Sequence, residues 1–441
     1  MTGRGLILAA PASGNGKTLV AAGLARHLRQ RGHRVATAKA GPDFVDPTFH
    51  RMATDRPSLN LDLWGMRPAT LAGLVAELEA NADLVLCEGA MGLFDGTGFA
   101  GEAGSTAELA RTTGWPIVLI VDARGQGASV AALVRGFATH QPLLPLAGVI
   151  FNRVVSDRHG ALLAGALARH LPSLFCFGGL ASDPALALPS RHLGLVPADE
   201  LEIADSTINR CAARIGAAVD VGRLLGLARS SALAAAGPAT PLPALGRRIA
   251  IAHDQAFCFA YPAVLEGWRR QGAELVFFSP LADEAPDCAA DSVYLPGGYP
   301  ELWADRLASA EGFAAGLCGA AAEAKTIYGE CGGYMVLGEA LIDIAGGRHR
   351  MVGLLPLVTS FAERRLHLGY RCVSLREDGP FGASGSRLRG HEFHYATVVN
   401  EDPGDRLLSV SDAAGTDLGT CGLRRGSVFG SFIHLIDRCD E

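Results

Sequence analysis

A cysteine on a glycine-flanked turn is the first feature of this chain that could do chemistry. Residues 328–341 read YGECGGYMVLGEAL, in which Cys331 follows a short apolar run and precedes Gly332 and Gly333. An apolar strand, a sharp turn and a helical pattern form a nucleophile elbow, which lifts a side chain above the edge of a sheet. The glycines would permit the bend and a close approach of the backbone. Because a helix N-terminus favours the thiolate, we predict that Cys331 is a nucleophile.

A second chemical motif lies near the amino terminus, where residues 10–24 read APASGNGKTLVAAGL. A strand, a glycine-rich turn, Lys-Thr and a helix form the layout of a phosphate-binding loop, although Pro11 replaces the usual first glycine. Lys17 can reach the outer phosphates of ATP, and Thr18 can ligate Mg²⁺. We predict that the nucleotide is bound by Gly14, Asn15, Gly16, Lys17 and Thr18.

Carboxylates follow two later strand-like runs. KAGPDFVDP contributes Asp43 and Asp46 beside Lys39, and CEGAMGLFDG contributes Glu88 and Asp95. Any one of these acids could be an ordinary solvated loop residue. As a group facing a phosphate loop, they predict Mg²⁺ ligands and binders of the group that is phosphorylated. We assign Thr18, Asp43 and Glu88 to the metal, and Asp43, Asp46 and Asp95 to the reaction.

The elements that must position these residues can be read from the alternation of apolar and helical patterns. In the first half, strand-length runs are GLILAA, RVATAKA, DLVLCEGA, PIVLIVDA, LAGVIFNRV and SLFCFGG. They predict a parallel sheet covered by helices, with sites at the carboxyl ends of its strands. A second series comprises RRIAIAHD, ELVFFSP, DSVYLPGG, TIYGECGG, LHLGYRCVSL, GHEFHYATVV and GSVFGSFIHL. Between the two series, residues 229–246 are rich in Ala, Pro and Ser and favour a linker. We expect two α/β domains, at 1–228 and 247–441.

Composition excludes several functional classes. At 441 residues, with 49% hydrophobic and 19% charged residues, the chain predicts a packed protein of more than one domain. A net charge of −6 without a basic block argues against a nucleic-acid partner. The 10 cysteines include no C-x-x-C pair, which argues against a zinc knuckle and fits a reducing cytoplasm.

Secretion and membrane insertion are not expected. The start MTGRGLILAAPASG superficially resembles a signal peptide, but its apolar run is short and GNGKT follows at once. No run approaches the roughly 20 apolar residues that a membrane-spanning helix needs.

The motifs SGNGKT, KAGPDFVDP and EGAMGLFDG together resemble the cobyrinic acid a,c-diamide synthases, over essentially the whole chain. This resemblance implies a P-loop domain similar to dethiobiotin synthetase, followed by a domain similar to triad-type glutamine amidotransferases. Asn152 in VIFNRV resembles the asparagine that reads adenine in related nucleotide-binding folds. A hydrogen bond at the end of the strand is the alternative role of Asn152.

The second half resembles the triad-type amidotransferases in the order of its residues. Cys331 is followed late in the domain by His434 in GSFIHLID, and LPGGYPE resembles the oxyanion strand of these enzymes. The resemblance implies that Cys331 attacks the glutamine amide and that His434 moves the proton. Backbone N–H groups near Gly298 and Gly332 would stabilise the oxyanion.

The third member of such a triad is missing from its usual place. These enzymes place a glutamate two residues after the histidine, where this chain has Ile436. Either His434 and Cys331 act as a dyad, with slower or more tightly gated glutaminase chemistry, or another acid orients His434. Asp437 lies one residue further and would need a bent strand end to reach the imidazole.

The stretch RGHEFHYATV invites a metal interpretation. Its spacing is H-E-x-H and not H-E-x-x-H, and in a strand His391 and Glu392 would point to opposite faces. We therefore predict no zinc site, and we assign no catalytic step to His391, Glu392 or His394.

An ATP site that activates a carboxylate and a site that frees ammonia from glutamine predict an ATP-dependent carbon–nitrogen ligase. By resemblance alone, the substrate is a corrin-type tetrapyrrole, amidated at the a and c acetates in cobalamin biosynthesis. Arginine supplies nearly all the positive charge, which suggests a G/C-rich bacterium and the cobalt-free ring, hydrogenobyrinic acid. The expected partners are this ring, glutamine and ATP, and a homodimer is one candidate assembly.

The sequence leaves three alternative functions open. Cobyric acid synthase amidates other arms of the same ring, and nickel-sirohydrochlorin a,c-diamide synthase acts on a related ring. A ParA/MinD-like ATPase switch would share the loop and the sheet. Such a switch needs a second lysine where Ala12 stands, and it leaves the cysteine domain unexplained.

Overall fold

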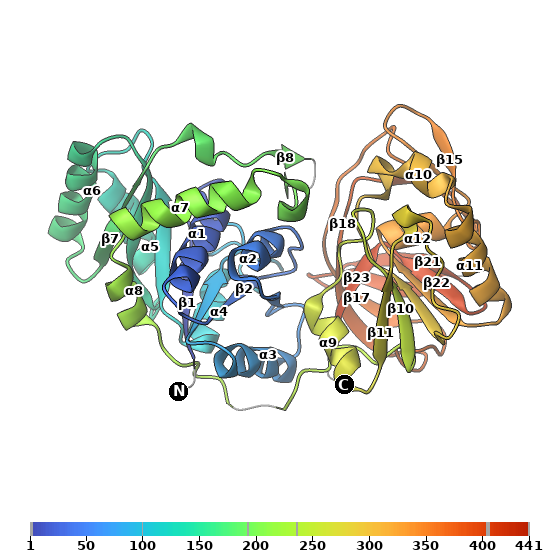
Figure 1. The fold of residues 1–441 in the computed structure, drawn as a ribbon. Coiled ribbons are helices and arrows are strands. Elements are labelled where there is room, and N and C mark those ends of the chain that lie inside the picture. Colours follow the sequence, from blue (N-terminus) through green and yellow to red (C-terminus); the bar gives the residue numbers. More distant parts are fainter. Residues whose placement is uncertain (1–2, 99, 192–193, 235–236, 403–405, 440–441) are drawn as a thin grey trace. The chain divides into compact units, whose positions relative to one another are not determined.

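The computed structural model of the chain describes residues 3–98, 100–191, 194–234, 237–402 and 406–439. They form two compact units (Figure 1), of which the first comprises Met1–Trp64 and Pro68–Gly237 and the second Gly65–Arg67 and Pro238–Glu441. The two tandem α/β domains are thus confirmed. The boundary lies within the segment 229–246, whose first residues belong to the first unit, because Gly5 and Arg229 exchange backbone hydrogen bonds.

The first unit is built on a seven-stranded parallel sheet of order β3-β2-β4-β1-β5-β6-β7. Its strands are β1 (Arg4–Ala9), β2 (Val35–Ala40), β3 (Ser58–Leu61), β4 (Leu84–Glu88), β5 (Ile117–Asp122), β6 (Leu146–Val154) and β7 (Phe175–Ala181). All of them except β3 coincide with the expected apolar runs. β3 escapes the pattern because its four residues, SLNL, include a buried serine and a buried asparagine.

Helices cover both faces of this sheet. They are α1 (Lys17–Gln30), α2 (Asp46–Thr54), α3 (Pro68–Ala80), α4 (Thr106–Thr113), α5 (Val130–Thr139), α6 (Asp157–His170), α7 (Ala204–Ala218) and α8 (Val221–Leu227). Right-handed crossovers place α1 and α2 on one face, where α7 packs against both (Figure 1), and α3 to α6 on the other. A short hairpin, β8 (Ser190–Arg191) and β9 (Gly194–Leu195), precedes α7. As predicted, α1 begins at the lysine of the GKT motif.

The second unit carries a ten-stranded mixed sheet of order β11-β10-β12-β13-β22-β21-β20-β17-β18-β23. Its parallel part is β10 (Arg248–Ala252), β11 (Glu274–Phe278), β12 (Ser292–Leu295), β13 (Thr326–Glu330) and β22 (Val428–Ser431). Its antiparallel part is β17 (His367–Leu375), β18 (Arg387–His394), β20 (Arg406–Asp412), β21 (Asp417–Arg425) and β23 (Ile433–Arg438). The antiparallel part therefore continues the sheet beyond β22, the last of the parallel strands.

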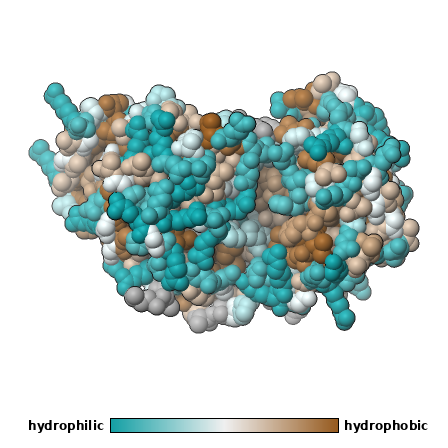
Figure 2. Space-filling model, viewed as in Figure 1, coloured by the Kyte–Doolittle hydropathy of each residue, from teal (hydrophilic) through white to brown (hydrophobic). Residues whose placement is uncertain are grey.

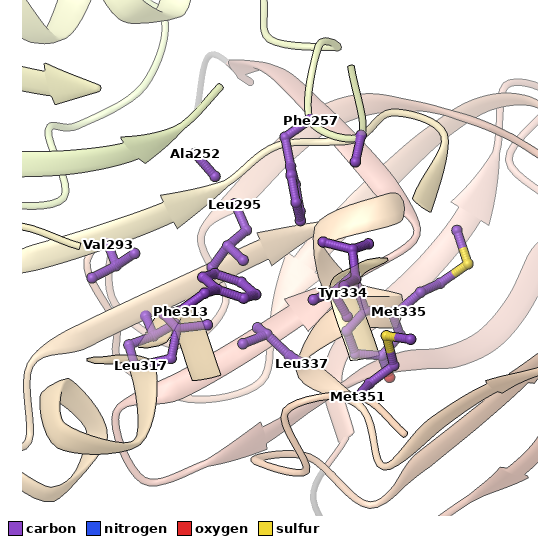
Figure 3. Packing of buried hydrophobic residues seen from close by; sticks show 14 of the residues in the cluster. Ala252, Phe257, Val293, Leu295, Phe313, Leu317, Tyr334, Met335, Leu337 and Met351 are labelled. Carbon is purple, nitrogen blue, oxygen red and sulfur yellow. The ribbon is translucent and has the colours of Figure 1, made fainter. Parts of the chain in front are cut away.

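Among the described residues, a smaller sheet and four α-helices complete this unit. The sheet contains β14 (Ala340–Ile342), β15 (Arg348–Arg350), β16 (Leu357–Ser360) and β19 (Thr397–Glu401). The helices are α9 (Pro262–Arg270), α10 (Ala304–Ala308), α11 (Glu311–Ala322) and α12 (Gly332–Leu337). The core packs around α12 and contains Phe257, Leu295, Phe313, Tyr334 and Leu337 (Figure 3).

The last apolar run, GSVFGSFIHL, is not one strand but two. The side-chain oxygen of Ser431 accepts a hydrogen bond from the N–H of Ile433, which turns the chain between β22 and β23. β22 pairs with β13, whereas β23 pairs with β18 at the edge of the sheet. This turn brings His434, on β23, back toward the end of β13. GHEFHYATVV divides in a similar way into β18 and β19.

Hydrophilic side chains cover much of the visible face of both units, with hydrophobic residues between them (Figure 2). Within the described residues, no helix combines the length and the apolar character that a membrane crossing requires.

Candidate active sites

Cys331 makes the sharp turn between β13 and α12. Its backbone angles, φ 47° and ψ −104°, lie outside the regions that non-glycine residues favour. The chain passes from strand to helix at this one residue, as in a nucleophile elbow. The N–H of Cys331 donates to the carbonyl oxygen of Ser431 at 2.8 Å, which ties the turn to β22.

The two glycines after Cys331 allow close packing and do not supply the turn themselves. A Cβ atom at Gly333 would lie 2.0 Å from the carbonyl oxygen of Leu295. A Cβ atom at Gly332 would lie 3.0 Å from the backbone nitrogen of Gly298. The positive φ falls on Cys331 and not on the glycines, so the glycines allow the close approach that was predicted but do not make the bend. The same contact brings together the two residues predicted to form the oxyanion site.

Cys331 and His434 meet at Gly297, on the loop after β12. A Cβ atom at Gly297 would lie 2.4 Å from Cε1 and 3.1 Å from Nε2 of His434, and 3.2 Å from Cβ of Cys331. His434 is only 1% exposed. Burial lowers the pKa of His434, but the sulfur of Cys331 and the carboxylate of Glu330 outweigh burial and raise this pKa to about 10. This environment favours the imidazolium form of His434.

Glu330, which the sequence argument did not single out, lies near the imidazole. Its Oε2 atom is 3.6 Å from Nδ1 of His434. Oε1 accepts hydrogen bonds from the hydroxyl of Tyr328 at 2.6 Å and the N–H of Leu435 at 3.1 Å, and Oε2 accepts one from the hydroxyl of Tyr294 at 2.8 Å. The sequence contained one signal that could have identified Glu330, because it is a charged residue at the end of the otherwise uncharged strand TIYGE.

Asp437, the candidate acid next to Ile436, is bound elsewhere. It is fully buried, and its Oδ1 atom lies 2.9 Å from Nη2 of Arg67. The N–H of Arg67 donates to Oδ2 of Asp437 at 2.9 Å. The side chain and the backbone N–H of Arg67 thus bind both carboxylate oxygens of Asp437, which pairs this acid with Arg67 and not with His434.

The histidines of β18 divide between the two faces of the strand. His391 stands opposite His434 in the β18–β23 pairing, and burial together with His434 lowers the pKa of His391 to about 3. On the other face, Glu392 and His394 lie with His367, their ligand atoms within 4.8 Å of one another. Glu392 forms an ion pair with Arg371 at 2.7 Å and lies 2.9 Å from Nε2 of His394.

The predicted site of the first unit gathers at the carboxyl ends of β2, β4 and β1, which are neighbours in the sheet. Lys39 and Glu88 face each other in the β2–β4 register and are 3% and 1% exposed. The Nζ atom of Lys39 lies 2.5 Å from Oδ2 of Asp46 and 3.1 Å from Oε1 of Glu88. His50, which was not predicted, places Nε2 2.7 Å from the other oxygen of Glu88.

The phosphate-binding loop contacts the same carboxylate. The hydroxyl of Thr18 donates to Oε1 of Glu88 at 2.9 Å, and Lys17 donates to the carbonyl oxygen of Met91 at 2.5 Å. Burial would raise the pKa of Glu88, but Lys39 and the hydrogen bond from His50 hold it well below its usual range. Glu88 is therefore a permanently ionised acceptor beside the loop.

The three remaining acids lie around the same lysines. Asp43 accepts hydrogen bonds from the N–H groups of Val45 and Asp46 at the start of α2. Burial and the neighbouring Asp43 raise the pKa of Asp46. Asp95 is exposed and accepts from the N–H of Gly92, yet its charge acts on Lys17. The structure thus brings together all four predicted carboxylates.

Asn152 contacts the loop itself. Its Nδ2 atom donates to the carbonyl oxygen of Asn15 at 2.8 Å, and a Cβ atom at Gly16 would lie 2.4 Å from this nitrogen. Arg153, which sequence reasoning missed, donates to the carbonyl oxygen of Gly14 at 2.7 Å and to Asp122 at 2.6 Å. A role of Asn152 toward adenine stays a prediction.

Comparisons with known proteins agree with the two sites. Residues 6–196 match the family of CobQ/CobB/MinD/ParA nucleotide binding domains, and residues 248–440 match CobB/CobQ-like glutamine amidotransferase domains. A Sinorhizobium sp protein named hydrogenobyrinate a,c-diamide synthase is 51% identical, covering 98% of both chains. Proteins of the same name from Brucella suis biovar 1 (strain 1330) and Rhizobium meliloti (strain 1021) are 51% and 50% identical, covering 99% and 98% of this chain and 99% of each relative.

Proposed function

The chain belongs to the hydrogenobyrinate a,c-diamide synthase family, and we propose that it amidates the a and c acetate carboxylates of hydrogenobyrinic acid in cobalamin biosynthesis. It is an ATP-dependent ligase that takes its nitrogen from glutamine. The observation that carries this proposal is the pairing, in one chain, of a Cys331–His434 elbow with a phosphate loop whose Thr18 and Lys17 adjoin buried carboxylates.

The first unit would activate the carboxylate. A carboxylate resists ammonia because its anionic oxygen is a poor leaving group. Transfer of the terminal phosphoryl group of ATP to a carboxylate oxygen gives an acyl phosphate and ADP, and ammonia then displaces phosphate to form the amide. Lys17 would offset charge on the phosphoryl oxygens, while Asp46 and Asp95 position the reacting group.

The donor set near the loop fits Mg²⁺, which prefers oxygen ligands. Thr18 offers a hydroxyl and Glu88 an ionised carboxylate, 2.9 Å apart, and Asp43 offers a second carboxylate nearby. When bound, Mg²⁺ would neutralise phosphoryl oxygens. Asn152 would bind adenine or, through its bond to Asn15, hold the loop in position.

The second unit would release ammonia. The thiolate of Cys331 attacks the amide carbon of glutamine, and the imidazolium of His434 gives a proton to the departing ammonia. Water, deprotonated by His434, then hydrolyses the thioester to glutamate and restores the thiol. Backbone N–H groups of Gly298 and Gly332 would stabilise the oxyanion of both steps.

The surroundings of the enzyme are also part of the proposal. All 10 cysteines are free, which is compatible with the reducing cytoplasm, and the net charge of −6 suits small-molecule partners over nucleic acid. A homodimer remains the candidate assembly, and sedimentation equilibrium measures it. The ParA/MinD-like switch gives the second unit no task.

Cys331→Ala tests the division of labour. Because ammonia reaches the acyl phosphate without the thiol, the variant should lose glutamine-dependent amidation and keep near-normal amidation with added ammonium. The measurement is ADP release and ring mass, with hydrogenobyrinic acid, cobyrinic acid and nickel-sirohydrochlorin as parallel substrates. Cys421→Ala, which removes a half-buried thiol of the same unit, is the control and should keep both activities.

Two results would contradict the proposal. If ammonium cannot support the Cys331→Ala variant, Cys331 does more than release ammonia. If cobyrinic acid or the nickel ring is amidated faster than hydrogenobyrinic acid, the assignment of the ring is wrong.

A further inference from the structure

We infer that Glu330, the residue directly before the nucleophile, is the acid that orients His434 and stabilises its imidazolium form. Glu330 is a positioning residue, since it acts through His434. The inference rests on the proposed roles of Cys331 and His434. It replaces the glutamate usually found where this chain has Ile436.

The two edges of the imidazole face different groups. Nε2 and Cε1 point to Gly297, where Cys331 also lies, whereas Nδ1 is 3.6 Å from Oε2 of Glu330. A carboxylate next to Nδ1 favours the tautomer with its proton there, which leaves Nε2 to take the proton of the thiol. The order of groups is therefore Glu330, His434, Cys331.

The Glu330 carboxylate is held rigidly at a buried site. Tyr294 and Tyr328 donate to it at 2.8 and 2.6 Å, and the N–H of Leu435 donates at 3.1 Å. Burial and the charge of Glu330 raise the pKa of both tyrosines, so they remain neutral donors. A buried negative charge with neutral partners is costly, and an imidazolium at His434 supplies the opposite charge.

The other ionisable groups near His434 are less suited to this role. Cys331 approaches from the elbow, and His391 approaches from β18 but is neutral across the assay range because its pKa is lowered to about 3. Asp437 is ion-paired with Arg67, and Glu392 is bound to Arg371 and His394 on the opposite face of β18. Glu330 is therefore the acid that is placed to orient His434.

Glu330→Gln provides the test, because it keeps the shape and removes the charge. The imidazolium form of His434 exists only below the pKa of this histidine, which sets the alkaline limb of the pH profile. Glu330 raises the pKa of His434, so its loss should lower this pKa and shift the alkaline limb of the glutaminase pH profile down by about one pH unit. We also expect kcat/KM for glutamine to fall by at least about tenfold, with ammonium-dependent amidation retained.

Two further variants keep the test decisive. Asp437→Asn, a matched loss of a buried carboxylate on the strand of His434, should leave the alkaline limb in place. Tyr294→Phe removes a donor to Oε2, which leaves more of that negative charge for His434 and should move the limb to higher pH. The Tyr294 variant alone decides the question if Glu330→Gln does not fold.

An unshifted limb in Glu330→Gln, or a shift in Asp437→Asn instead, would overturn the inference. A purely structural role of Glu330 would lower the rate or the yield of protein without moving the limb. Failure of the proposed function is a separate result, because it would appear as glutamine-dependent amidation by Cys331→Ala.

Discussion

Lys17 and Lys39 lie at the same edge of the first sheet, yet their charges are held in opposite ways. Burial lowers the pKa of Lys39, but Asp46 and Glu88 outweigh burial and raise this pKa above its usual range. Burial lowers the pKa of Lys17, and the nearby acids do not outweigh it. Asp46 and Glu88 therefore already stabilise the positive charge of Lys39. The positive charge of Lys17 would be stabilised most by an anion that binds beside it. The phosphates of ATP would be such an anion.

Lys17→Ala should reduce amidation at least about a hundredfold, because the variant loses charge stabilisation of the phosphoryl group in transfer. The loss should be equal with glutamine and with ammonium, since both nitrogen sources need the acyl phosphate. Initial rates of ADP release measure the effect. Lys325→Ala, which removes a lysine bound to Glu323 and to the carbonyl oxygen of Cys288, should keep full activity. A normal rate in Lys17→Ala would remove the loop from the chemistry.

At the scale of elements, the elbow depends on how closely three backbone segments approach. The positive φ of Cys331 aims the side chain, and glycines in the loop after β12 and in α12 let that loop come within contact of α12 and β23. The helix after the turn has only six residues. Packing against the core, and not helix length, therefore holds the elbow in place.

Gly297→Ala tests this close approach. The added Cβ would lie 2.4 Å from Cε1 of His434, a distance so short that the imidazole or the loop must shift, which disturbs the placement of His434 beside Cys331. We expect glutaminase activity to fall at least about a hundredfold, as a small misplacement of catalytic groups does, while ammonium-dependent amidation continues. Gly319→Ala, in α11 where nothing lies near the new methyl group, is the matched control. Full glutaminase activity in Gly297→Ala would contradict the placement of His434.

At the scale of the whole molecule, the second unit includes a segment that lies far from it in sequence. Gly65–Arg67 belongs to this unit, and Arg67 pairs with Asp437 across 370 residues of sequence. Asp437 is fully buried, so Arg67 offsets a charge that would otherwise be isolated.

Arg67→Met should destabilise the second unit by about 3–5 kcal/mol, the usual effect of leaving one partner of a buried ion pair alone. Arg67→Met with Asp437→Asn should recover most of that loss, because the isolated charge is gone. Urea unfolding of the wild type, both single variants and the double variant gives the coupling energy. Additive effects in this cycle would show that the two residues do not depend on each other.

Local pattern alone determined much of this protein. The strand, turn and helix around Lys17, the elbow at Cys331 and the alternation of runs in both units depend on neighbouring residues, and short-range backbone geometry makes such features readable. The carboxylates after β2 and β4 could be predicted to meet, since parallel strands bring their carboxyl ends to one edge.

Only the tertiary structure decided which groups complete the two sites. Glu330 reaches Leu435 across 105 residues, and Arg153 reaches Gly14 across 139, through pairings that no local pattern contains. The turn at Ser431 divides a run that looked continuous, and His50 binds Glu88 because α2 packs against β2 and β3. Such contacts depend on the register of strands and the packing of helices. Residue type and spacing were therefore enough to identify His434 but not the acid beside it.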